Sequence, residues 1–243
     1  MKKTVLITGA NRGLGLSLTK EFLAHGYMVF AGVYAKIDDA QVNLIKGNEN
    51  LYLIDLDITD LDSVKKALAS VREHTQTLEI IINSAAIIPY NENQTDKNSL
   101  FGELDYDAIL DVINVNALGA IRVANVFSEL LVNGEKKLLV NISSEAGSLS
   151  NCYRDDWLGY CMSKTALNMA SLIMHNELKK HKSRVLLFEP GYMQTYMHGY
   201  QNIDATYHPD FTAQNIYMQI EKLGDEQGEK PLFVDMFGND AKW

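Results

Sequence analysis

Short apolar runs rich in β-branched residues alternate along the whole chain with longer stretches of helical periodicity. Strands covered on both faces give uninterrupted apolar runs, whereas strands with one solvated face alternate apolar and polar residues. Seven runs predict strands: Thr4–Thr8, Met28–Val33, Leu51–Ile54, Glu79–Ile82, Lys137–Asn141, Arg184–Glu189 and Leu232–Asp235. Because strand–helix alternation with right-handed crossovers builds one kind of sheet, we expect an α/β fold: a doubly wound parallel sheet of about seven strands with helices on both faces.

Five stretches of helical period lie between these runs: Gly13–His25, Leu61–His74, Tyr106–Val132, Tyr160–Lys180 and Thr212–Leu223. In the fourth, helical spacing predicts one buried apolar stripe: Tyr160, Leu167, Ala170, Ile173 and Met174. Two irregular segments remain, a polar surface loop at Pro89–Ser99 and a candidate lid at Tyr192–Pro209. No internal repeat, low-complexity tract or flexible linker divides the chain, so we expect a single domain over residues 1–243.

The charge and the apolar runs exclude two classes of partner. The 243 residues carry a formal net charge of −9 at pH 7, and nucleic-acid binding needs a basic face, so we expect no nucleic-acid partner. The longest uninterrupted apolar runs, such as Ile80–Ile82 and Val185–Phe188, are far shorter than the ~20 residues that cross a bilayer. We therefore expect no membrane span.

The first residues and the cysteines bear on the cellular compartment. Only a short apolar run separates Met1 from Gly9, which is too short for the apolar core of a secretory signal. The two cysteines, Cys152 and Cys161, lack metal-ligand spacing, and the six histidines form no zinc-binding motif. We expect a cytoplasmic protein with free thiols and no metal site.

A glycine-rich loop follows the first predicted strand, with the sequence Thr8-Gly9-Ala10-Asn11-Arg12-Gly13-Leu14-Gly15, and a predicted helix follows the loop. Glycines let the chain turn tightly and let a pyrophosphate approach the backbone, while the free N–H groups of the helix meet its charge. The alternative is an ordinary tight turn between a strand and a helix. The candidate cofactor-binding residues here are Gly9, Asn11, Arg12, Gly13, Leu14 and Gly15.

Tyr160 and Lys164 lie four residues apart at the start of a predicted helix and therefore share one face. In a chain with 12 tyrosines such a pair also arises by chance, so its weight comes from context: Ser144 ends the preceding strand, and the carboxyl ends of parallel strands share one edge with the glycine loop. A lysine ammonium about 5 Å from a phenol, at an effective dielectric near 20, favours phenolate by about 3 kcal/mol, or roughly 2 pK units. Tyr160 is thus a candidate general acid and base for a carbonyl or alcohol oxygen, which Ser144 holds by a hydrogen bond.

Together these residues resemble the short-chain dehydrogenase/reductase family, in its single-domain branch of about 250 residues. The glycine spacing Gly-x-x-x-Gly-x-Gly matches that family, and the likeness covers nearly the whole chain. Further matches are Asp57-Ile58 at the adenine, Asn83-Ser84-Ala85-Ala86 where the family has Asn-Asn-Ala-Gly, Asn116 of the catalytic tetrad, and Pro190-Gly191 with Thr195 beside the nicotinamide. Ala86 in place of glycine is a departure that could shift the loop near the cofactor.

The resemblance implies a Rossmann-type fold, a nicotinamide cofactor and a small-molecule carbonyl or alcohol substrate. It also implies that Tyr160 and Lys164 contact the cofactor, Lys164 at the nicotinamide ribose, and that Asn116 kinks its helix to hold a water of the proton relay. The 16-residue Ser144–Tyr160 separation and the ending Gly-Asn-Asp-Ala-Lys-Trp are most similar to the carbonyl-reductase branch that includes sniffer and the C-factor proteins. Family members form dimers and tetramers through helices such as Tyr106–Val132 and Tyr160–Lys180, so a homodimer or homotetramer is expected by analogy.

Cofactor preference depends on the end of the second predicted strand, where an acidic residue would bind the adenosine ribose and repel a 2′-phosphate. Val33 and Tyr34 occupy that place, and neither is acidic. Arg12 in the glycine loop offers a charge-assisted hydrogen bond to the phosphate, so we expect NADP(H) to be favoured over NAD(H). The alternative is that Arg12 and Lys36 are solvated loop residues. Asp38 and Asp39 lie nearby in the sequence, and their negative charge weakens the case for a phosphate site.

Three other functions compete with an NADP-dependent oxidoreductase. A dinucleotide-binding sensor or signalling protein keeps this scaffold with little turnover. A sugar-nucleotide epimerase shares the Tyr–Lys pair but usually needs a larger C-terminal domain than the roughly 50 residues after Pro190-Gly191, and a serine hydrolase needs a Gly-x-Ser-x-Gly elbow that residues 146–150 lack. Candidate substrate-pocket residues, each equally explained by ordinary packing, are Leu149, Tyr153, Trp157, Tyr192 and Met193.

Overall fold

The computed structural model describes residues 2–34, 47–88, 100–197, 199, 201–226 and 228–243. Its centre is a seven-stranded parallel sheet in the order β3-β2-β1-β4-β5-β6-β7. The strands are β1 (Thr4–Thr8), β2 (Met28–Val33), β3 (Leu51–Asp55), β4 (Ile80–Asn83), β5 (Leu138–Ile142), β6 (Arg184–Glu189) and β7 (Leu232–Asp235). The predicted α/β fold with a doubly wound parallel sheet is confirmed, and every strand bound agrees with the sequence prediction to within one residue.

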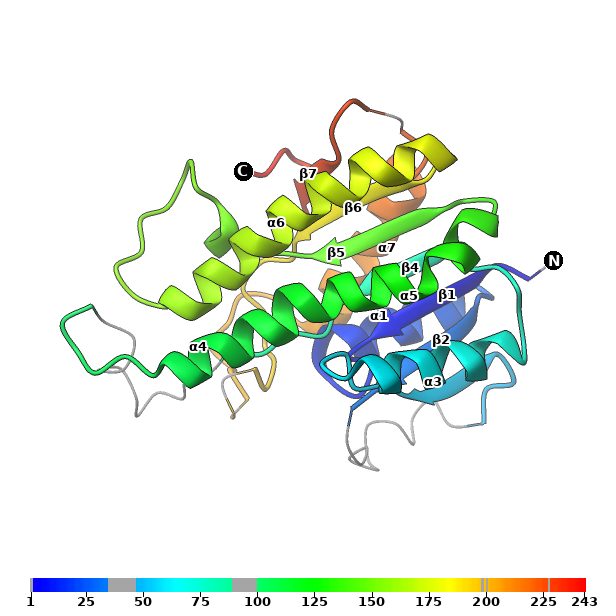
Figure 1. Ribbon diagram of the computed structural model, residues 1–243, viewed down its shortest axis with the longest axis horizontal. Helices are drawn as coiled ribbons and strands as arrows, with labels where there is room; N and C mark the ends of the chain where they lie inside the picture. The colour runs from blue at the N-terminus through cyan, green and yellow to red at the C-terminus, as the bar shows by residue number, and fades with distance from the viewer. Residues whose placement is uncertain (1, 35–46, 89–99, 198, 200, 227) are drawn as a thin grey trace.

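Helices cover both faces of this sheet, with α3, α5 and α6 on one side and α1 and α7 on the other (Figure 1). The α-helices are α1 (Gly13–Ala24), α3 (Leu61–Arg72), α4 (Tyr106–Ile113), α5 (Ala120–Asn133), α6 (Leu158–Leu178) and α7 (Pro209–Leu223). Three short elements accompany them: a π-helical turn η2 (Asn114–Gly119) and the 3₁₀ turns η3 (Glu145–Gly147) and η4 (Lys179–His181). The stretch predicted as one helix, Tyr106–Val132, is therefore continuous but contains a π-helical turn at its middle.

Side chains of the central strands alternate between two hydrophobic clusters. Ile7 and Ile82 face α1 and α7, whereas Leu6 and Ile81 face α3 and α5, and all four are fully buried. The edge strand β3 departs from the prediction of strands covered on both faces, because of its five residues only Ile54 is buried. An edge strand has a neighbour on one side only, which leaves part of its surface to solvent.

The buried face of α6 differs from the predicted apolar stripe. Tyr160 and Leu167 are buried as predicted, Ala170 and Met174 are half-buried, and Ile173 is 61% exposed. The side chains that face the protein interior are largely small or polar: Ser163, Lys164, Asn168, Ser171 and His175. Hydrogen bonds satisfy several of them, for example Ser171 Oγ accepting from Asn141 Nδ2 at 2.8 Å, so this face shows no apolar period in the sequence.

Residues 106–133, spanning α4, η2 and α5, form the one described helical stretch long and apolar enough to cross a membrane, with a mean hydropathy of 1.4 in its best window. Charged residues such as Asp111 and Arg122 interrupt this stretch, so it contains no long uninterrupted apolar run. Half of that window is buried inside the fold, which a core helix of a globular protein also shows. The predicted surface loop Pro89–Ser99 lies outside the described residues, as do Lys36, Asp38 and Asp39.

Candidate active site

The glycine loop between β1 and α1 is built from close backbone approaches. Gly9 and Gly13 have φ angles of +67° and +55°, in the left-handed region that disfavours other residues. A Cβ on Gly9 would lie 2.8 Å from the Cα of Ala85, and a Cβ on Gly15 would lie 2.2 Å from the carbonyl oxygen of Gly9. Glycine is therefore required at these positions by the fold of the loop itself.

The N-terminus of α1 opens at this loop and has no side-chain cap. Arg12 is its N-cap residue in an extended conformation and makes no capping hydrogen bond. Asn11 and Gly13 are partly exposed, while Leu14 is 6% exposed and packs in the core beneath the loop. Uncapped N–H groups and the helix dipole favour an anion here, so this end of α1 fits the pyrophosphate of a dinucleotide.

The loops after β4 and β6 lie against the glycine loop. Thr8 Oγ1 accepts hydrogen bonds of 3.1 Å from the backbone N–H groups of Ser84 and Ala85. The methyl group of Thr195 lies 3.4 Å from the position that a Cβ on Gly13 would take. Three segments that the sequence predicted to bind one cofactor therefore meet at the carboxyl edge of the sheet.

Asn83 turns its side chain away from this edge. It is 4% exposed, and its Nδ2 donates to Asn141 Oδ1 at 2.9 Å, which joins β4 to β5 in the core. The cofactor contact expected at Asn83 stays a prediction, and the side chain itself lies in the sheet interior.

The segment after β6 folds back on itself before α7. Pro190 is buried, and Gly191 has a φ of +79° with the Tyr207 ring 3.1 Å from the position of an added Cβ. Gln194 N–H donates to the Tyr207 carbonyl at 2.9 Å, and Tyr207 N–H donates to the Tyr192 carbonyl at 3.0 Å. Hydrogen bonds thus hold much of Tyr192–Pro209 together; residues 198 and 200 of this candidate lid lie outside the described residues.

The adenine side of the predicted site lies at the ends of β2 and β3. Tyr34 is 63% exposed directly after β2. Asp57 is fixed by a local turn: its Oδ1 accepts from Thr59 N–H at 2.8 Å and from Thr59 Oγ1 at 2.7 Å. Ile58 is 7% exposed, and its side chain packs in the hydrophobic cluster on the α3 and α5 side of the sheet.

Ser144, Tyr160 and Lys164 come together at the carboxyl edge, as predicted. Ser144 is the N-cap of η3, where its Oγ accepts from Ala146 N–H at 3.2 Å, and its side chain lies near enough to the Tyr160 hydroxyl to favour the phenolate. Lys164 is 2% exposed, and its Nζ donates to the Ile142 carbonyl at 2.9 Å and lies 5.7 Å from the centre of the Tyr160 ring. A phenol, a hydroxyl and an amine thus share one partly enclosed corner.

Burial dominates the electrostatics of this corner and corrects the sequence prediction. The phenolate loses its hydration among apolar neighbours, which raises the pKa of Tyr160 to about 12, although the hydrogen bond with Ser144 acts in the opposite direction. Burial also lowers the pKa of Lys164 to about 8. We predicted that Lys164 would lower the pKa of Tyr160, but desolvation of the phenolate is the larger effect.

Asn116 lies inside the π-helical turn η2 and makes three side-chain hydrogen bonds. Its Oδ1 accepts from Ile87 N–H at 2.8 Å, and its Nδ2 donates to the Ile87 carbonyl at 2.9 Å and to Ser163 Oγ at 3.0 Å. Ser163 Oγ in turn donates to the Tyr160 carbonyl at 2.7 Å. The predicted fourth member of the tetrad therefore ties the loop after β4 to the helix that carries Tyr160.

The wall around Tyr160 is apolar and differs in part from the predicted pocket. Trp157 packs edge-on against the Tyr160 ring with centroids 5.8 Å apart, whereas Leu149 and Tyr153 are 76% and 73% exposed. Tyr192 is exposed, and Met193 is half-buried against the core on the α1 and α7 side. Met197, which belongs to the candidate lid Tyr192–Pro209, also lines the wall, and three side chains that the prediction missed complete it: Ile87, Ile88 and Cys161. Ile87 and Ile88 directly follow the predicted cofactor segment Asn83-Ser84-Ala85-Ala86. That adjacency is the one sequence feature that pointed to them.

A charged pair flanks the same wall. Arg154 forms an ion pair with Glu145, the residue after Ser144, and its guanidinium lies 4.7 Å from the centre of the Trp157 ring. The pair brings one positive and one negative charge to the edge of the corner.

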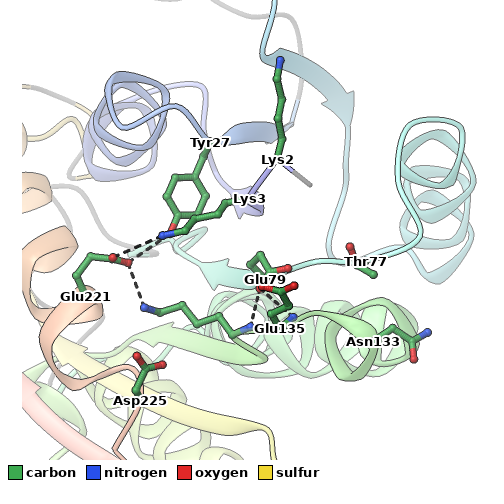
Figure 2. A pocket seen from close by; sticks show the side chains of 10 residues that line it. Lys2, Lys3, Tyr27, Thr77, Glu79, Asn133, Glu135, Glu221 and Asp225 are labelled. Atoms are coloured by element: carbon green, nitrogen blue, oxygen red, sulfur yellow. Dashed lines mark hydrogen bonds and ion pairs between the residues drawn. The ribbon is translucent and has the colours of Figure 1, made fainter.

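A separate cavity of about 340 Å³ lies at the opposite, amino edge of the sheet (Figure 2). Glu221 lies at one side of it and is contacted by Tyr27 Oη at 3.3 Å, Lys3 Nζ at 3.9 Å and Lys136 Nζ at 3.1 Å. Glu79 accepts two backbone N–H bonds there, from residues 135 and 136. The polar groups of this cavity are largely paired with one another, and it lies away from the glycine loop. Within the described part of the chain, no cluster of three His, Cys, Asp or Glu side chains could hold a metal ion.

Comparison with known proteins gives one consistent result. The family model described as short chain dehydrogenase matches residues 3–206. The chain is 32% identical over 196 residues to the short-chain dehydrogenase/reductase atnB of Arthrinium sp, a match covering 78% of this chain and 74% of that protein. Among solved structures, carbonyl reductase Sniffer of D. melanogaster superposes with a TM-score of 0.86 at 25% identity, covering all of both chains. The NADPH-bound carbonyl reductase from chicken fatty liver superposes with a TM-score of 0.83 at 26% identity, covering 100% of this chain and 99% of that one.

Proposed function

The chain belongs to the short-chain dehydrogenase/reductase family, and from that premise we propose that it transfers a hydride between NADP(H) and a small-molecule carbonyl or alcohol substrate. The observation that carries this proposal is the convergence of Ser144, Tyr160 and the buried Lys164 at the sheet edge where the glycine loop opens. The glycine loop and the uncapped N-terminus of α1 fit the dinucleotide. When bound, the nicotinamide supplies or accepts the hydride.

The chain's own residues handle the proton and the oxygen. With a pKa of about 12, Tyr160 keeps its proton at neutral pH and is ready to donate it to a carbonyl oxygen. Ser144 positions that oxygen through its hydroxyl. In the alcohol-oxidising direction Tyr160 must first lose its proton, and Lys164 is the cation placed to favour this.

Lys164 and Asn116 complete the predicted catalytic set. Lys164 holds its amine beneath the Tyr160 ring through the Ile142 carbonyl. Asn116 fixes the backbone of Tyr160 through Ser163, so the phenol keeps its place during proton transfer. The apolar wall of Ile87, Trp157 and Met197 excludes water from the reacting carbon and favours a substrate with an apolar body.

The preference for NADP(H) rests on Arg12. It is exposed at the N-cap of α1 and forms no ion pair with any described residue, and Val33 and Tyr34 bring no carboxylate to the end of β2. A charge-assisted hydrogen bond of about 1.5–3 kcal/mol corresponds to roughly a 10- to 150-fold preference for the 2′-phosphate. The solved NADPH complex of chicken carbonyl reductase supports the choice of cofactor by likeness.

Replacing Arg12 by Leu is expected to weaken NADPH binding by roughly 10- to 150-fold and to leave NADH binding nearly unchanged. Nicotinamide fluorescence during titration of the protein with each cofactor, at fixed salt, measures both dissociation constants. Lys20→Leu is the matched control, because Lys20 lies on the same helix but contacts Asp210. Equal affinity of the unmodified protein for NADH and NADPH would contradict the assignment.

We also propose a homodimer or homotetramer in the cytoplasm. Apolar side chains remain exposed along α4, η2 and α6: Tyr106, Leu110, Leu118, Met162, Met169 and Ile173. A surface of this kind is typical of a protein interface, and the two cysteines are free thiols, as expected in a reducing compartment. A molar mass of two or four chains by light scattering is the expected result, and Ile173→Glu is expected to lower it; a monomeric mass for the unmodified protein would overturn this proposal.

A further inference from the structure

Arg122 joins the segment assigned to the adenine to the π-helical turn that carries Asn116. It projects from the first turn of α5, and its guanidinium donates to the Ile58 carbonyl at 3.2 Å, in the segment assigned to the adenine. The same group donates to Asn114 Oδ1 at 2.7 Å and to the Asn114 carbonyl at 3.4 Å. Asn114 is the first residue of the π-helical turn that contains Asn116.

The π-helical turn itself brings Arg122 onto the face of Asn114. Eight residues of regular α-helix rotate through ~800°, which is ~80° beyond two full turns. A π-bulge absorbs one extra residue, so the rotation becomes ~700°, within ~20° of two turns. If the turn relaxed to regular α-helix, Arg122 would rotate away from Asn114, so these hydrogen bonds stabilise the π form.

Gly119, the last residue of the turn, packs directly on the adenine-side segment. A Cβ at this position would lie 2.6 Å from the Cδ1 of Ile58, so the Ile58 side chain occupies the space that any other residue would fill. Ile58 is therefore held twice, by its side chain against the end of the turn and by its carbonyl through Arg122. The adenine-side segment and the π-helical turn form one packed unit.

The other end of this unit reaches the catalytic helix. Within the turn, Asn116 clamps the backbone of Ile87 and donates to Ser163, which donates to the Tyr160 carbonyl. Hydrogen bonds thus run from Ile58 through Arg122 to Asn114, and from Asn116 through Ser163 to the backbone of Tyr160. The backbone of the turn joins the two sets.

We propose that Arg122 is a positioning residue that couples the adenine-side segment to the catalytic set. Residues 57 and 58 are already held in place by their own contacts, and binding at the adenine site restrains them further. Arg122 transmits that restraint to the π-helical turn and so to Asn116 and Tyr160. This inference rests on the proposed function for its assignment of the adenine site and of the tetrad. Its physical basis is the π-helical turn, which Arg122 contacts at one end and Asn116 connects to the helix of Tyr160 at the other.

Kinetics of Arg122→Met test the coupling, and Arg72→Met is the matched control. Arg72 lies on α3 and forms an ion pair with Glu129 of α5, but it contacts neither Ile58 nor Asn114. For Arg122→Met we expect kcat to fall about 10-fold at saturating cofactor and the affinity for NADPH to fall about 5-fold. Arg122→Lys keeps the positive charge but lacks the planar guanidinium. We expect its kcat and its affinity for NADPH to lie between those of Arg122→Met and those of the unmodified protein. A loss of thermal stability in Arg122→Met with kcat and affinity equal to those of Arg72→Met would overturn the inference.

Amide hydrogen exchange provides a readout that needs no turnover. The probe is adenosine 2′,5′-bisphosphate, which carries the adenine half of NADP and cannot reach Asn116 or Tyr160 directly. In the unmodified protein and in Arg72→Met, we expect this probe to slow exchange in residues 114–119, and in Arg122→Met we expect the slowing to disappear. Slowing that persists in Arg122→Met, or slowing absent from the unmodified protein, would contradict the inference. Arg122-dependent slowing in a protein that reduces no carbonyl would overturn the proposed function and leave this inference standing.

Discussion

Tyr160→Phe is expected to lower kcat by about 10²- to 10⁴-fold while the dissociation constant for NADPH stays within about twofold of the unmodified value. The substitution removes the hydroxyl that lies beside Ser144 and keeps the ring that packs against Trp157. The apolar corner therefore retains its shape and loses its proton donor. Steady-state kinetics with a carbonyl substrate and a fluorescence titration with NADPH measure the two quantities.

Tyr52→Phe is the matched control for this change. Tyr52 lies on β3, packs against Phe30 and His74, and is far along the sheet order from the catalytic corner. We expect its kcat to equal that of the unmodified protein. If Tyr160→Phe retained most of its kcat, the assignment of Tyr160 as general acid and base would be wrong.

Lys164→Met is expected to abolish most turnover and to change the pH dependence of stability. In the absence of cofactor, burial lowers the pKa of Lys164 from 10.5 to about 8, so the folded protein releases this proton at lower pH than the unfolded chain. Between those two values the unfolded state binds more protons, and the free energy of unfolding therefore rises with pH. The stabilisation is present above pH 10.5 and is lost as the pH falls through about 8.

Denaturant unfolding of both proteins without cofactor, at pH 7 and at pH 10.5, measures this effect. Relative to Lys164→Met, the unmodified protein is expected to gain on the order of 3 kcal/mol between the two conditions, because one pK unit corresponds to about 1.4 kcal/mol. Loss of the hydrogen bond to the Ile142 carbonyl contributes a constant difference in the free energy of unfolding between the two proteins. The change of that difference with pH therefore reports the titration of Lys164 alone. A stability difference that stayed constant over this range would show that Lys164 is hydrated rather than buried.

The fold could be predicted because its strands carry an uninterrupted signal. Runs such as Thr4–Thr8 and Arg184–Glu189 are apolar along most of their length because helices cover both faces of the central strands, and the glycine loop marks where the first helix begins. The edge strand β3 carries a similar apolar run and yet is largely uncovered. Sequence alone does not record which strand ends the sheet.

The site could be predicted in its residues but only partly in its energetics. Ser144, Tyr160 and Lys164 meet as expected because strand ends and helix starts share one edge of the sheet. The pKa of Tyr160 is raised, opposite to the prediction, which rested on the Coulomb attraction of Lys164. The apolar wall desolvates the phenolate, and this effect is larger. Desolvation depends on neighbours such as Ile87 and Met197, which come from distant parts of the chain.

Two further features have no simple periodic signal. The buried face of α6 carries polar side chains such as Ser163 and Asn168, which pair by hydrogen bonds and leave no apolar period in the sequence. The predicted apolar stripe therefore included Ile173, which the structure leaves exposed. The π-helical turn contacts Arg122 at Asn114 and Ile58 at Gly119, and only the folded chain brings these residues together. Asn116 was placed in the site by resemblance, and its hydrogen-bonding partners became visible only in the structure.

The most direct test of the central claim is turnover itself. The purified protein is mixed with NADPH and a panel of aldehydes and ketones with apolar bodies, and the loss of reduced nicotinamide absorbance is followed alongside formation of the alcohol. The proposed function predicts stoichiometric alcohol formation with at least one carbonyl and its collapse in Tyr160→Phe. Tight NADPH binding with no alcohol formed across the panel would contradict that function and favour a dinucleotide-sensing protein on the same scaffold.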